Sequence, residues 1–362
     1  MGPSSSNAGR TKPDKSFPYR GLASMSVLLV FLIGLKAALA LFQPFDSNGR
    51  SIIRLEHGEG AIALASKVGT FRTAQWMNWP DRLVIRAMAA GASLQAGEYD
   101  VSAHKDLWSL IEAIQNGRRF KRTVTLVEGW TLADWQRALE SAPGIRLSHG
   151  ETKQDLSNSS ENDLGTLGEG WFMPDTYQYE WGTAADSVYA RANQAMVSEL
   201  QRWIGTVNVE SAFSDEDRGV IIHFKARDWL TLASMVEKES NRFDDQRKIA
   251  RVFLNRLARG MRLQSDPTVI YALGNKFDGD LTRRDLKLDA PHNTYRHKGL
   301  PPGPICNPGR QAIEAAFRPV DGDWLYFVGR GDGTSQFSKT LHEHNRAVRK
   351  YQLGLESGED RG

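Results

Sequence analysis

Two glutamates, Glu237 and Glu239, stand near the end of a helix that we predict over residues 228–241. The apolar residues before them recur with the spacing of one buried helix face, and they are Leu232, Met235 and Val236. With about 3.6 residues in each turn, Glu239 returns to within about 20° of Leu232, whereas Glu237 points about 140° away, toward the polar side. We therefore expect Glu239 to end an apolar stripe and Glu237 to face outward.

The predicted surroundings of Glu239 suit acid/base chemistry on a sugar. Desolvation among apolar side chains disfavours the charged carboxylate and raises its pKa. A carboxylic acid that is still neutral near pH 7 is what the protonation of a glycosidic oxygen requires. The alternative for the same residue is a buried ion pair with Arg251 or Arg256 on the following predicted helix.

The segments after these glutamates have the composition of a cleft wall. Residues 260–271 are predicted to form a turn followed by a helix, with the hydrogen-bonding side chains of Gln264, Asp266 and Tyr271. Two further segments, 291–295 and 299–305, are rich in proline and glycine and are predicted to be rigid loops. Loops that helices hold in place often carry binding residues.

Composition excludes several kinds of site. The chain has 362 residues with 46 basic and 43 acidic side chains, so its net charge is only +3 and the basic residues are spread among acids. This does not favour a nucleic-acid partner. The one cysteine, Cys306, cannot form an internal disulfide and is expected to be a small buried apolar residue. No familiar metal-ligand spacing or phosphate-binding loop occurs, so we expect no metal and no cofactor.

The N-terminal residues predict that the protein is attached to a membrane. Residues 1–20 are polar and basic and are expected to be a disordered cytoplasmic tail, and residues 21–43 are apolar apart from Lys36. A stretch of this length suits a transmembrane helix, with the following residues on the outer side of the inner membrane. The alternative is a cleaved signal peptide that ends at Ala38-Leu39-Ala40.

Between the membrane segment and the glutamates, the sequence predicts a small module and a linker. Strand and helix patterns alternate over residues 44–145, and they resemble a glycan-binding LysM-like α/β module, although a simple spacer domain has the same pattern. Residues 146–168 are polar and predict a flexible linker. A catalytic domain is expected over 169–352, followed by a disordered tail over 353–362. The predicted fold class is α+β, with a mainly helical catalytic domain and a short sheet.

Several motifs together resemble the MltG (YceG-like) family of endolytic murein transglycosylases. Two of them are Met235-Val236-Glu237-Lys238-Glu239-Ser240 and Gln264-Ser265-Asp266-Pro267-Thr268. The other matching segments are residues 127–129, 169–170, 174–177, 252–257, 269–271, 293–295, 299–305 and 325–328. In this family the second glutamate of the Glu-Lys-Glu triplet is the catalytic one, which the resemblance places at Glu239.

The resemblance implies a lytic transglycosylase. Such an enzyme cleaves the β-1,4 bond between MurNAc and GlcNAc in nascent peptidoglycan, leaves a 1,6-anhydro-MurNAc end and terminates glycan strands. The resemblance also implies that peptidoglycan strands are the substrate. It suggests a peptidoglycan synthase of the elongation machinery as a partner. We predict substrate-binding roles for five residues: Gln264, Asp266, Tyr271, Asn293 and Tyr295.

The sequence departs from the family pattern at two places, and two other functions stay open. His292 stands where a tyrosine is usual, and Ser335-Gln336-Phe337 lacks the usual histidine. One alternative is a peptidoglycan glycoside hydrolase with Asp266 as a second carboxylate, because ordinary glycosidases use a carboxyl pair. The other is a membrane-anchored scaffold that binds glycan without cutting it.

Overall fold

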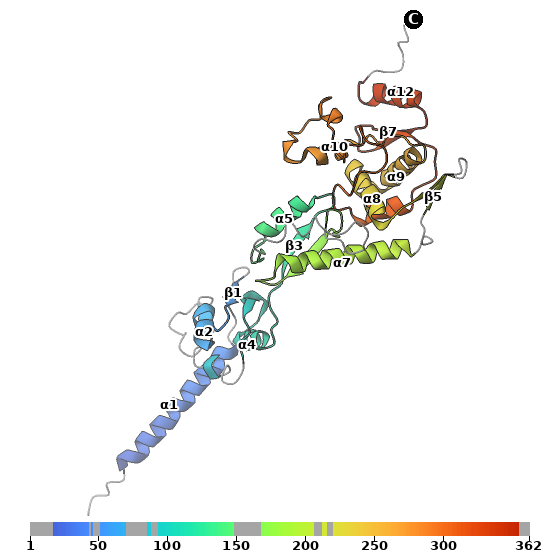
Figure 1. The fold of residues 1–362 in the computed structure, drawn as a ribbon. Helices are drawn as coiled ribbons and strands as arrows, with labels where there is room; N and C mark the ends of the chain where they lie inside the picture. Colours follow the sequence, from blue (N-terminus) through green and yellow to red (C-terminus); the bar gives the residue numbers. More distant parts are fainter. Residues whose placement is uncertain are drawn as a thin grey trace, which may run out of the picture. The chain divides into compact units, whose positions relative to one another are not determined.

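The computed structural model describes residues 17–42, 45, 51–69, 85–87, 93–147, 168–205, 212–215 and 220–354. The chain divides into two compact units, residues 1–121 (unit 1) and 122–362 (unit 2) (Figure 1). Most of the predicted N-terminal tail, most of the predicted linker at 146–168 and nearly all of the predicted C-terminal tail lie outside the described residues.

The first element that the structure describes is helix α1 (Phe17–Phe42), which is rich in apolar residues. Its exposed large apolar side chains are Met25, Val27, Leu28, Leu29, Val30, Phe31, Leu32, Ile33, Leu35, Leu39 and Phe42. In the part of the chain that the structure describes, no helix combines the length and the apolar character needed to cross a bilayer. The transmembrane helix predicted at 21–43 is therefore not confirmed.

Unit 1 is built around one antiparallel strand pair. Strand β1 (Ile52–Leu55) pairs with β2 (Gly97–Asp100), with Ile53 opposite Tyr99. The strands are joined in one apolar core by helix α2 (Ala61–Gly69) and helix α4 (Leu107–Gln115), and a short helix η2 (Val101–Ala103) follows β2. The likeness to a LysM module stays a prediction.

The boundary between the units differs from the predicted one. Strand β3 (Arg122–Leu126) and helix α5 (Leu132–Ser141) were expected in the first module, but they belong to unit 2. The reason is that β3 pairs antiparallel with β4 (Asp175–Tyr179), a strand on the far side of the predicted linker, with Val124 opposite Tyr177. A long-range pairing of this kind leaves no local pattern in the sequence.

The first part of unit 2 packs its aromatic residues inward. Helix α7 (Ala185–Ile204) closes a core over β3, β4 and α5. In this core, Phe172 is fully buried, and its ring lies 5.8 Å from that of Trp135 and 5.2 Å from that of Tyr189. Trp171 is buried as well, so both aromatic residues at 171–172 are core residues.

The second part of unit 2 is mainly helical. Helices α8 (Ala226–Glu239), α9 (Phe243–Ala258) and α11 (Arg310–Phe317) pack together around one large apolar core (Figure 1). Three elements follow α9 along the chain before α11: α10 (Asp266–Leu273), η4 (Gly274–Lys276) and η5 (Asp285–Lys287). Cys306 is buried there, as predicted.

The strands of this part form short hairpins. Strand β5 (Ala212–Asp215) pairs with β6 (Val220–His223), and β7 (Tyr326–Gly329) pairs with β8 (Ser335–Ser338). Helix α12 (Leu341–Tyr351) packs on the second hairpin. The predicted mixture of helices and short sheets is confirmed for unit 2, and the helix predicted at 228–241 corresponds to α8.

Candidate active site

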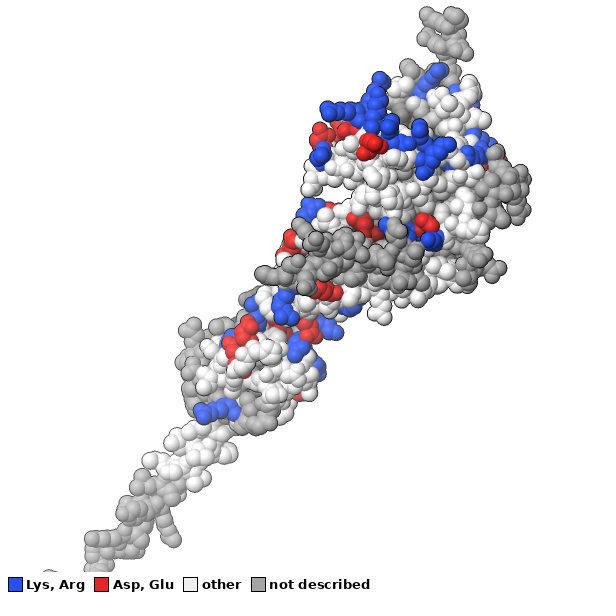
Figure 2. Space-filling model, viewed as in Figure 1, with Lys and Arg blue, Asp and Glu red and all other residues white. Residues whose placement is uncertain are grey.

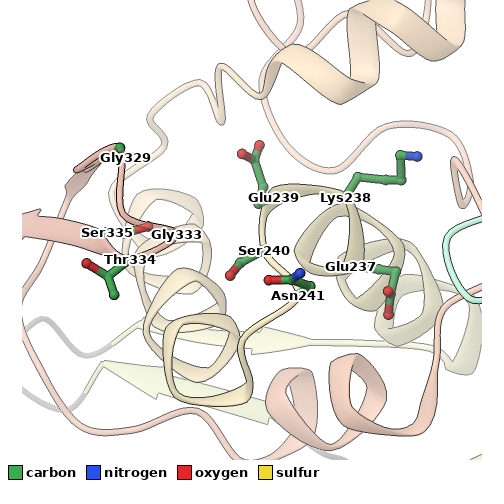
Figure 3. A pocket seen from close by; sticks show the side chains of 10 residues that line it. Glu237, Lys238, Glu239, Ser240, Asn241, Gly329, Gly333, Thr334 and Ser335 are labelled. Atoms are coloured by element: carbon green, nitrogen blue, oxygen red, sulfur yellow. The ribbon is translucent and has the colours of Figure 1, made fainter.

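Glu239 is the last residue of α8, and the apolar stripe that precedes it is buried. Leu232, Met235 and Val236 are each 0% exposed. The stripe anchors α8 in the core, and its final turn carries Glu239 to the edge of that core, where the side chain is half-buried. Figure 3 shows Glu239 and Glu237 leaving the end of α8 in opposite directions.

One oxygen of Glu239 is held and the other is available. The hydroxyl of Ser265 donates to Glu239 Oε1 at 2.5 Å. Ser265 is buried, and its backbone N–H donates to the Thr294 hydroxyl oxygen at 3.0 Å, which in turn lies 2.9 Å from the Thr268 hydroxyl. Among the described residues, Glu239 Oε2 has no hydrogen-bond partner, so this oxygen can meet a ligand.

The surroundings of Glu239 keep it close to half protonated at neutral pH. Burial raises the pKa of Glu239 to about 7, and the negative charge of Asp266 acts in the same direction. The hydrogen bond from Ser265 and the positive charge of Arg256 lower the pKa and partly offset these effects. Such a group can give a proton and take one back without a large free-energy cost in either direction.

The alternative of a buried ion pair does not hold for Glu239. Arg251 pairs with Asp321 at 2.9 Å and donates to the carbonyl oxygen of Val320. Arg256 donates to the carbonyl oxygens of Leu325 and Leu263, at 2.6 and 2.7 Å. Both guanidinium groups are thus directed elsewhere, and within the described residues neither forms a salt bridge with Glu239.

Glu237 does not face solvent as the helical projection predicts. It is half-buried, and its Oε2 accepts a hydrogen bond from the backbone N–H of Gly309 at 3.0 Å. Burial raises the pKa of Glu237 to about 6, and the nearby charge of Glu128 adds to this. The polar side of α8 is covered because the N-terminus of α11 packs there, which the helical period of α8 alone cannot reveal.

A pocket of about 540 Å³ lies beside Glu239. Its lining residues are Glu237, Lys238, Glu239, Ser240, Asn241, Gly329, Gly331, Gly333, Thr334 and Ser335 (Figure 3). They come from the end of α8 and from the turn between β7 and β8, and Asp245 fixes that turn by accepting the backbone N–H of Ser335 at 2.8 Å. Figure 2 shows that this face of unit 2 is also hollowed between the regions of α10 and α5.

Three of the five predicted substrate-binding residues gather next to Glu239. Tyr295 donates its hydroxyl to Asp266 Oδ1 at 2.6 Å, and burial, this hydrogen bond and the charges of Asp266 and Glu239 raise the pKa of Tyr295. Gln264 is exposed, and its φ of 49° turns the chain just before Ser265. Their role in binding substrate stays a prediction.

The structure gives the other two predicted residues different surroundings. Asn293 is fully buried, and its amide donates to the carbonyl oxygens of Leu286 and Leu288. It therefore supports a loop and does not offer its side chain to a sugar. Tyr271 is half-buried on α10, where burial and the charge of Glu169 raise the pKa of its hydroxyl, and its ring lies 4.9 Å from that of His292.

Two residues of the site were missed at the level of sequence. Ser265, the hydrogen-bond donor to Glu239, lies between two residues that were chosen, within a motif that matches the family. Glu169 also lies in a matching motif, but nothing in its local sequence shows that its carboxylate accepts the backbone N–H of Leu132 at the start of α5. In the described part of the chain, no group of three or more His, Cys, Asp or Glu side chains could hold a metal ion.

The fold and the site place one half-buried carboxyl group, that of Glu239, beside an open pocket. Comparison with known proteins gives the family. The chain belongs to the YceG-like family, whose model matches residues 55–350.

Relatives of known name are similar over most of the chain. The endolytic murein transglycosylase of Bacillus subtilis is 33% identical over 279 residues, which cover 72% of this chain and 74% of that protein. The endolytic murein transglycosylase of Streptococcus pneumoniae (strain D39) is 28% identical over 291 residues, which cover 71% of this chain and 51% of that protein. A crystal structure of a YceG-like protein from Listeria monocytogenes is also similar, with 26% identity, a TM-score of 0.48 and coverage of 83% of this chain and 99% of that one.

Proposed function

We propose that this chain is an endolytic murein transglycosylase, which cuts within the glycan strands of peptidoglycan with Glu239 as its acid/base. The observation that carries the proposal is the state of Glu239. It is half-buried beside a groove, its pKa is raised by burial to about 7, and one of its oxygens has no partner among the described residues. The names of the relatives support the same activity.

In the proposed first step, protonated Glu239 gives its proton to the oxygen that joins MurNAc C1 to GlcNAc C4, and the bond between C1 and that oxygen breaks. In the second step, the Glu239 carboxylate takes the proton of the MurNAc 6-hydroxyl, and O6 forms a bond to C1. The products are a GlcNAc 4-hydroxyl end and a 1,6-anhydro-MurNAc end, and Glu239 is again protonated. No water enters the balance.

A single carboxyl group is sufficient for this sequence of steps. The attacking hydroxyl belongs to the same sugar ring, and intramolecular nucleophiles reach effective molarities of about 10⁵ M or more. A hydrolase would need a second carboxylate to activate water. Asp266 is the candidate for that role, but its Oδ1 accepts the Tyr295 hydroxyl. We propose instead that Asp266, Tyr295 and Gln264 bind sugar hydroxyls next to Glu239.

Digestion of purified peptidoglycan sacculi tests the proposal. The wild-type protein should produce muropeptides with ends lighter by one water than reducing ends. Glu239→Gln keeps the size and can still accept from Ser265, but it has no proton to give, so activity should fall by about 10²-fold or more. Mass spectrometry of the end groups measures both the amount and the type of product.

A matched control makes the outcome specific. Glu140 is exposed on α5, and its carboxylate accepts a surface hydrogen bond from Gln136. Glu140→Gln should therefore cut like the wild type. Reducing ends in place of anhydro ends would support the hydrolase. If the wild-type and Glu239→Gln proteins bind sacculi equally and neither protein cuts them, the result would support the non-catalytic scaffold.

We further propose that the protein is held at the inner membrane through residues 21–43, as a single-pass protein whose unit 2 faces the periplasmic or outer side. There it would terminate nascent strands beside a peptidoglycan synthase. The apolar sequence of this segment and the exposed apolar side chains of α1 support attachment. Cell fractionation tests it: the full chain should stay with membranes after alkaline extraction, and a chain that starts at residue 44 should be released.

A further inference from the structure

Glu237 is a half-buried carboxyl group that no step of the proposed reaction uses, although it lines the same pocket as Glu239. Its Oε2 accepts the backbone N–H of Gly309 at 3.0 Å. Gly309 is the N-cap residue of α11 and has no side chain with which to cap that helix. The last turn of α8 therefore brings a carboxyl group to the N-terminus of α11, where unpaired N–H groups and the helix dipole favour a negative charge.

The loop after β3 meets the end of α8 at the same place. A Cβ at Gly309 would overlap the carboxyl group of Glu128, so the close approach of this loop needs a residue without a side chain. The next residue of the loop, Gly129, accepts from the side chain of Lys238 at 3.3 Å through its carbonyl oxygen. Glu237 and Lys238 thus connect the last turn of α8 to two neighbouring segments.

These two segments are joined to each other by their backbones. The N–H of Gly129 donates to the carbonyl oxygen of Asn307 at 2.9 Å, and the N–H of Asn307 donates to the carbonyl oxygen of Trp130 at 2.9 Å. Asn307 is fully buried, and its side-chain amide also donates to Trp130, at 3.2 Å. Residues 128–130 and 307–309 therefore form one hydrogen-bonded unit, which we call the junction.

Helix α8 also contacts the chain just before the junction. The hydroxyl oxygen of the fully buried Ser234 accepts the backbone N–H of Ile305 at 3.0 Å, and the Ser234 carbonyl oxygen lies 3.4 Å from the thiol of Cys306. Glu237 continues this contact to the end of the helix. Glu239 leaves the helix in the opposite direction (Figure 3), so the place of its carboxyl group depends on how firmly the last turn of α8 is bound.

We propose that Glu237 is a positioning residue for the cleavage reaction: its hydrogen bond to Gly309 binds the last turn of α8 to the junction, and so keeps the carboxyl group of Glu239 half-buried beside the pocket. This inference rests on the proposed function. Glu237 transfers no proton in this scheme and acts through the backbone of the turn that it shares with Glu239. The reach of its side chain to Gly309 matters more than its charge.

The alkaline limb of the pH profile of kcat/KM reports the burial of Glu239. Activity falls above about pH 7 because Glu239 loses the proton that it must give, and burial is the largest cause of its raised pKa. If the last turn of α8 is released, Glu239 becomes more exposed and its pKa falls from about 7 toward the ordinary value of 4.5. The alkaline limb then moves to lower pH. A change that only destabilises the fold leaves this limb in place.

The charges near Glu237 have to be separated from its hydrogen bond. Burial raises the pKa of Glu237 to about 6 and the charge of Glu128 adds to this, whereas the hydrogen bond from Gly309 and the charge of Lys238 lower it. The thiol of Cys306 is a further titratable group that faces Glu237. Glutamine and methionine at position 237 both remove the charge, so a difference between these two variants comes from the hydrogen bond.

The test compares Glu237→Gln, Glu237→Met and Glu237→Asp, all as full-length proteins cutting purified glycan strands between pH 4 and pH 9. Glutamine can still accept the N–H of Gly309, so kcat/KM should stay within about twofold of the wild type and the alkaline limb should not move. Methionine has a similar length but no such acceptor. Its kcat/KM at pH 7 should fall by about tenfold, and its alkaline limb should move to lower pH. Aspartate keeps the charge but is one methylene shorter, so it should behave like methionine.

Asp228 provides the matched control at the other end of α8. Its Oδ2 accepts the backbone N–H of Lys225 at 2.9 Å, so Asp228→Leu removes the same kind of hydrogen bond from the same helix. The melting temperatures of Asp228→Leu and Glu237→Met should both fall by a few degrees. The alkaline limb of Asp228→Leu should nevertheless stay at the wild-type pH.

Each outcome decides between positioning and a purely structural role. Equal losses in Glu237→Gln and Glu237→Met would overturn the inference, as would a reduced rate in Glu237→Met with an unmoved alkaline limb. If Glu237→Met does not fold, the comparison of glutamine with aspartate decides, and an aspartate variant with the wild-type rate and limb would overturn the inference. If the wild type itself forms no anhydro ends, the proposed function fails. If the wild type forms them and all three Glu237 variants keep its rate and profile, only the role of Glu237 fails.

Discussion

Ser265 donates to one oxygen of Glu239 and so determines which oxygen is left for proton transfer. Ser265 is itself buried, and its backbone N–H donates to the Thr294 hydroxyl oxygen, so the residue that holds Glu239 is fixed in place. A group that must give a proton and then recover one at the same sugar benefits from such a fixed position, because the geometry needs no rearrangement between the two steps.

Replacement of Ser265 by alanine should show separately how this residue affects the position and the pKa of the Glu239 carboxyl group. The Ser265 hydrogen bond lowers the pKa of Glu239, so Ser265→Ala should raise that pKa and move the alkaline limb of the pH profile upward. A looser carboxyl group should also reduce kcat by about tenfold. The pH dependence of kcat on purified glycan strands measures both effects.

The exposed Ser141 of α5 provides the control, since its hydroxyl donates to the carbonyl oxygen of Ala138 in its own helix. Ser141→Ala should change neither kcat nor the position of the alkaline limb of the pH profile. A Ser265→Ala enzyme with a reduced rate but an unmoved alkaline limb would contradict the assigned hydrogen bond to the acid.

At the scale of elements, the turn between β7 and β8 forms one wall of the pocket beside Glu239. Gly331 and Gly333 line that pocket with φ angles of 84° and 81°, in the left-handed region that side chains other than hydrogen disfavour. Both positions are open, since a Cβ there would meet no atom within 4 Å. The two glycines thus serve the shape of the turn and not its packing.

Gly333→Ala should therefore change the turn without a steric clash in the core. The strain of the left-handed conformation costs about 1 kcal/mol, and a shift of the turn backbone beside the pocket would relieve it. We expect KM for glycan strands to rise several-fold while kcat changes little. Steady-state kinetics on strands of defined length give the two constants separately.

Gly182 is the matched control for this change, because its φ is 87°, a Cβ there also meets no atom within 4 Å, and it lies in the turn between β4 and α7. Gly182→Ala should lower the melting temperature to the same extent as Gly333→Ala and leave KM unchanged. An equal rise of KM in both variants would assign the effect to general destabilisation.

The repeat of apolar residues along the sequence predicts the helix that carries Glu239. Whether other side chains are exposed or covered depends on contacts between distant segments, which this repeat does not reveal. The apolar stripe of α8 is visible because it repeats within one helix, and it correctly places Glu239 at the edge of the core. Glu237 was assigned to solvent by the same reasoning, but the backbone of Gly309 from another segment covers it. Asn293 looked like a sugar ligand because an amide has the right chemistry, yet it satisfies carbonyl groups of its own loop.

At the scale of the whole molecule, the pairing of β3 with β4 moves the start of the catalytic unit to Arg122. The sequence alone placed that start at residue 169, because the strand and helix at 122–141 continue the pattern of the module before them. The apolar core that contains Trp135, Phe172 and Tyr189 needs residues from both sides of the predicted linker.

Two fragments should therefore behave differently. A fragment of residues 122–354 contains both β3 and β4 and should fold cooperatively and produce anhydro ends. A fragment of residues 146–354 lacks β3 and Trp135, so part of its core is open to solvent, and we expect it to lose several kcal/mol of stability. Thermal unfolding followed by circular dichroism, together with digestion of sacculi, compares the two. Equal melting temperatures would contradict the boundary at Arg122.

Arg256 is held by carbonyl oxygens on two sides, so its charge acts on Glu239 through space and without contact. A cation in direct contact would lower the pKa of Glu239 so far that the carboxylate would not readily recover a proton. Without any cation nearby, the pKa would be higher and the acid would not readily release its proton. At its fixed position Arg256 lowers the pKa of Glu239 to an intermediate extent. Any change that moves this one charge should therefore shift the operating pH of the enzyme, even when every group that touches the sugar stays the same.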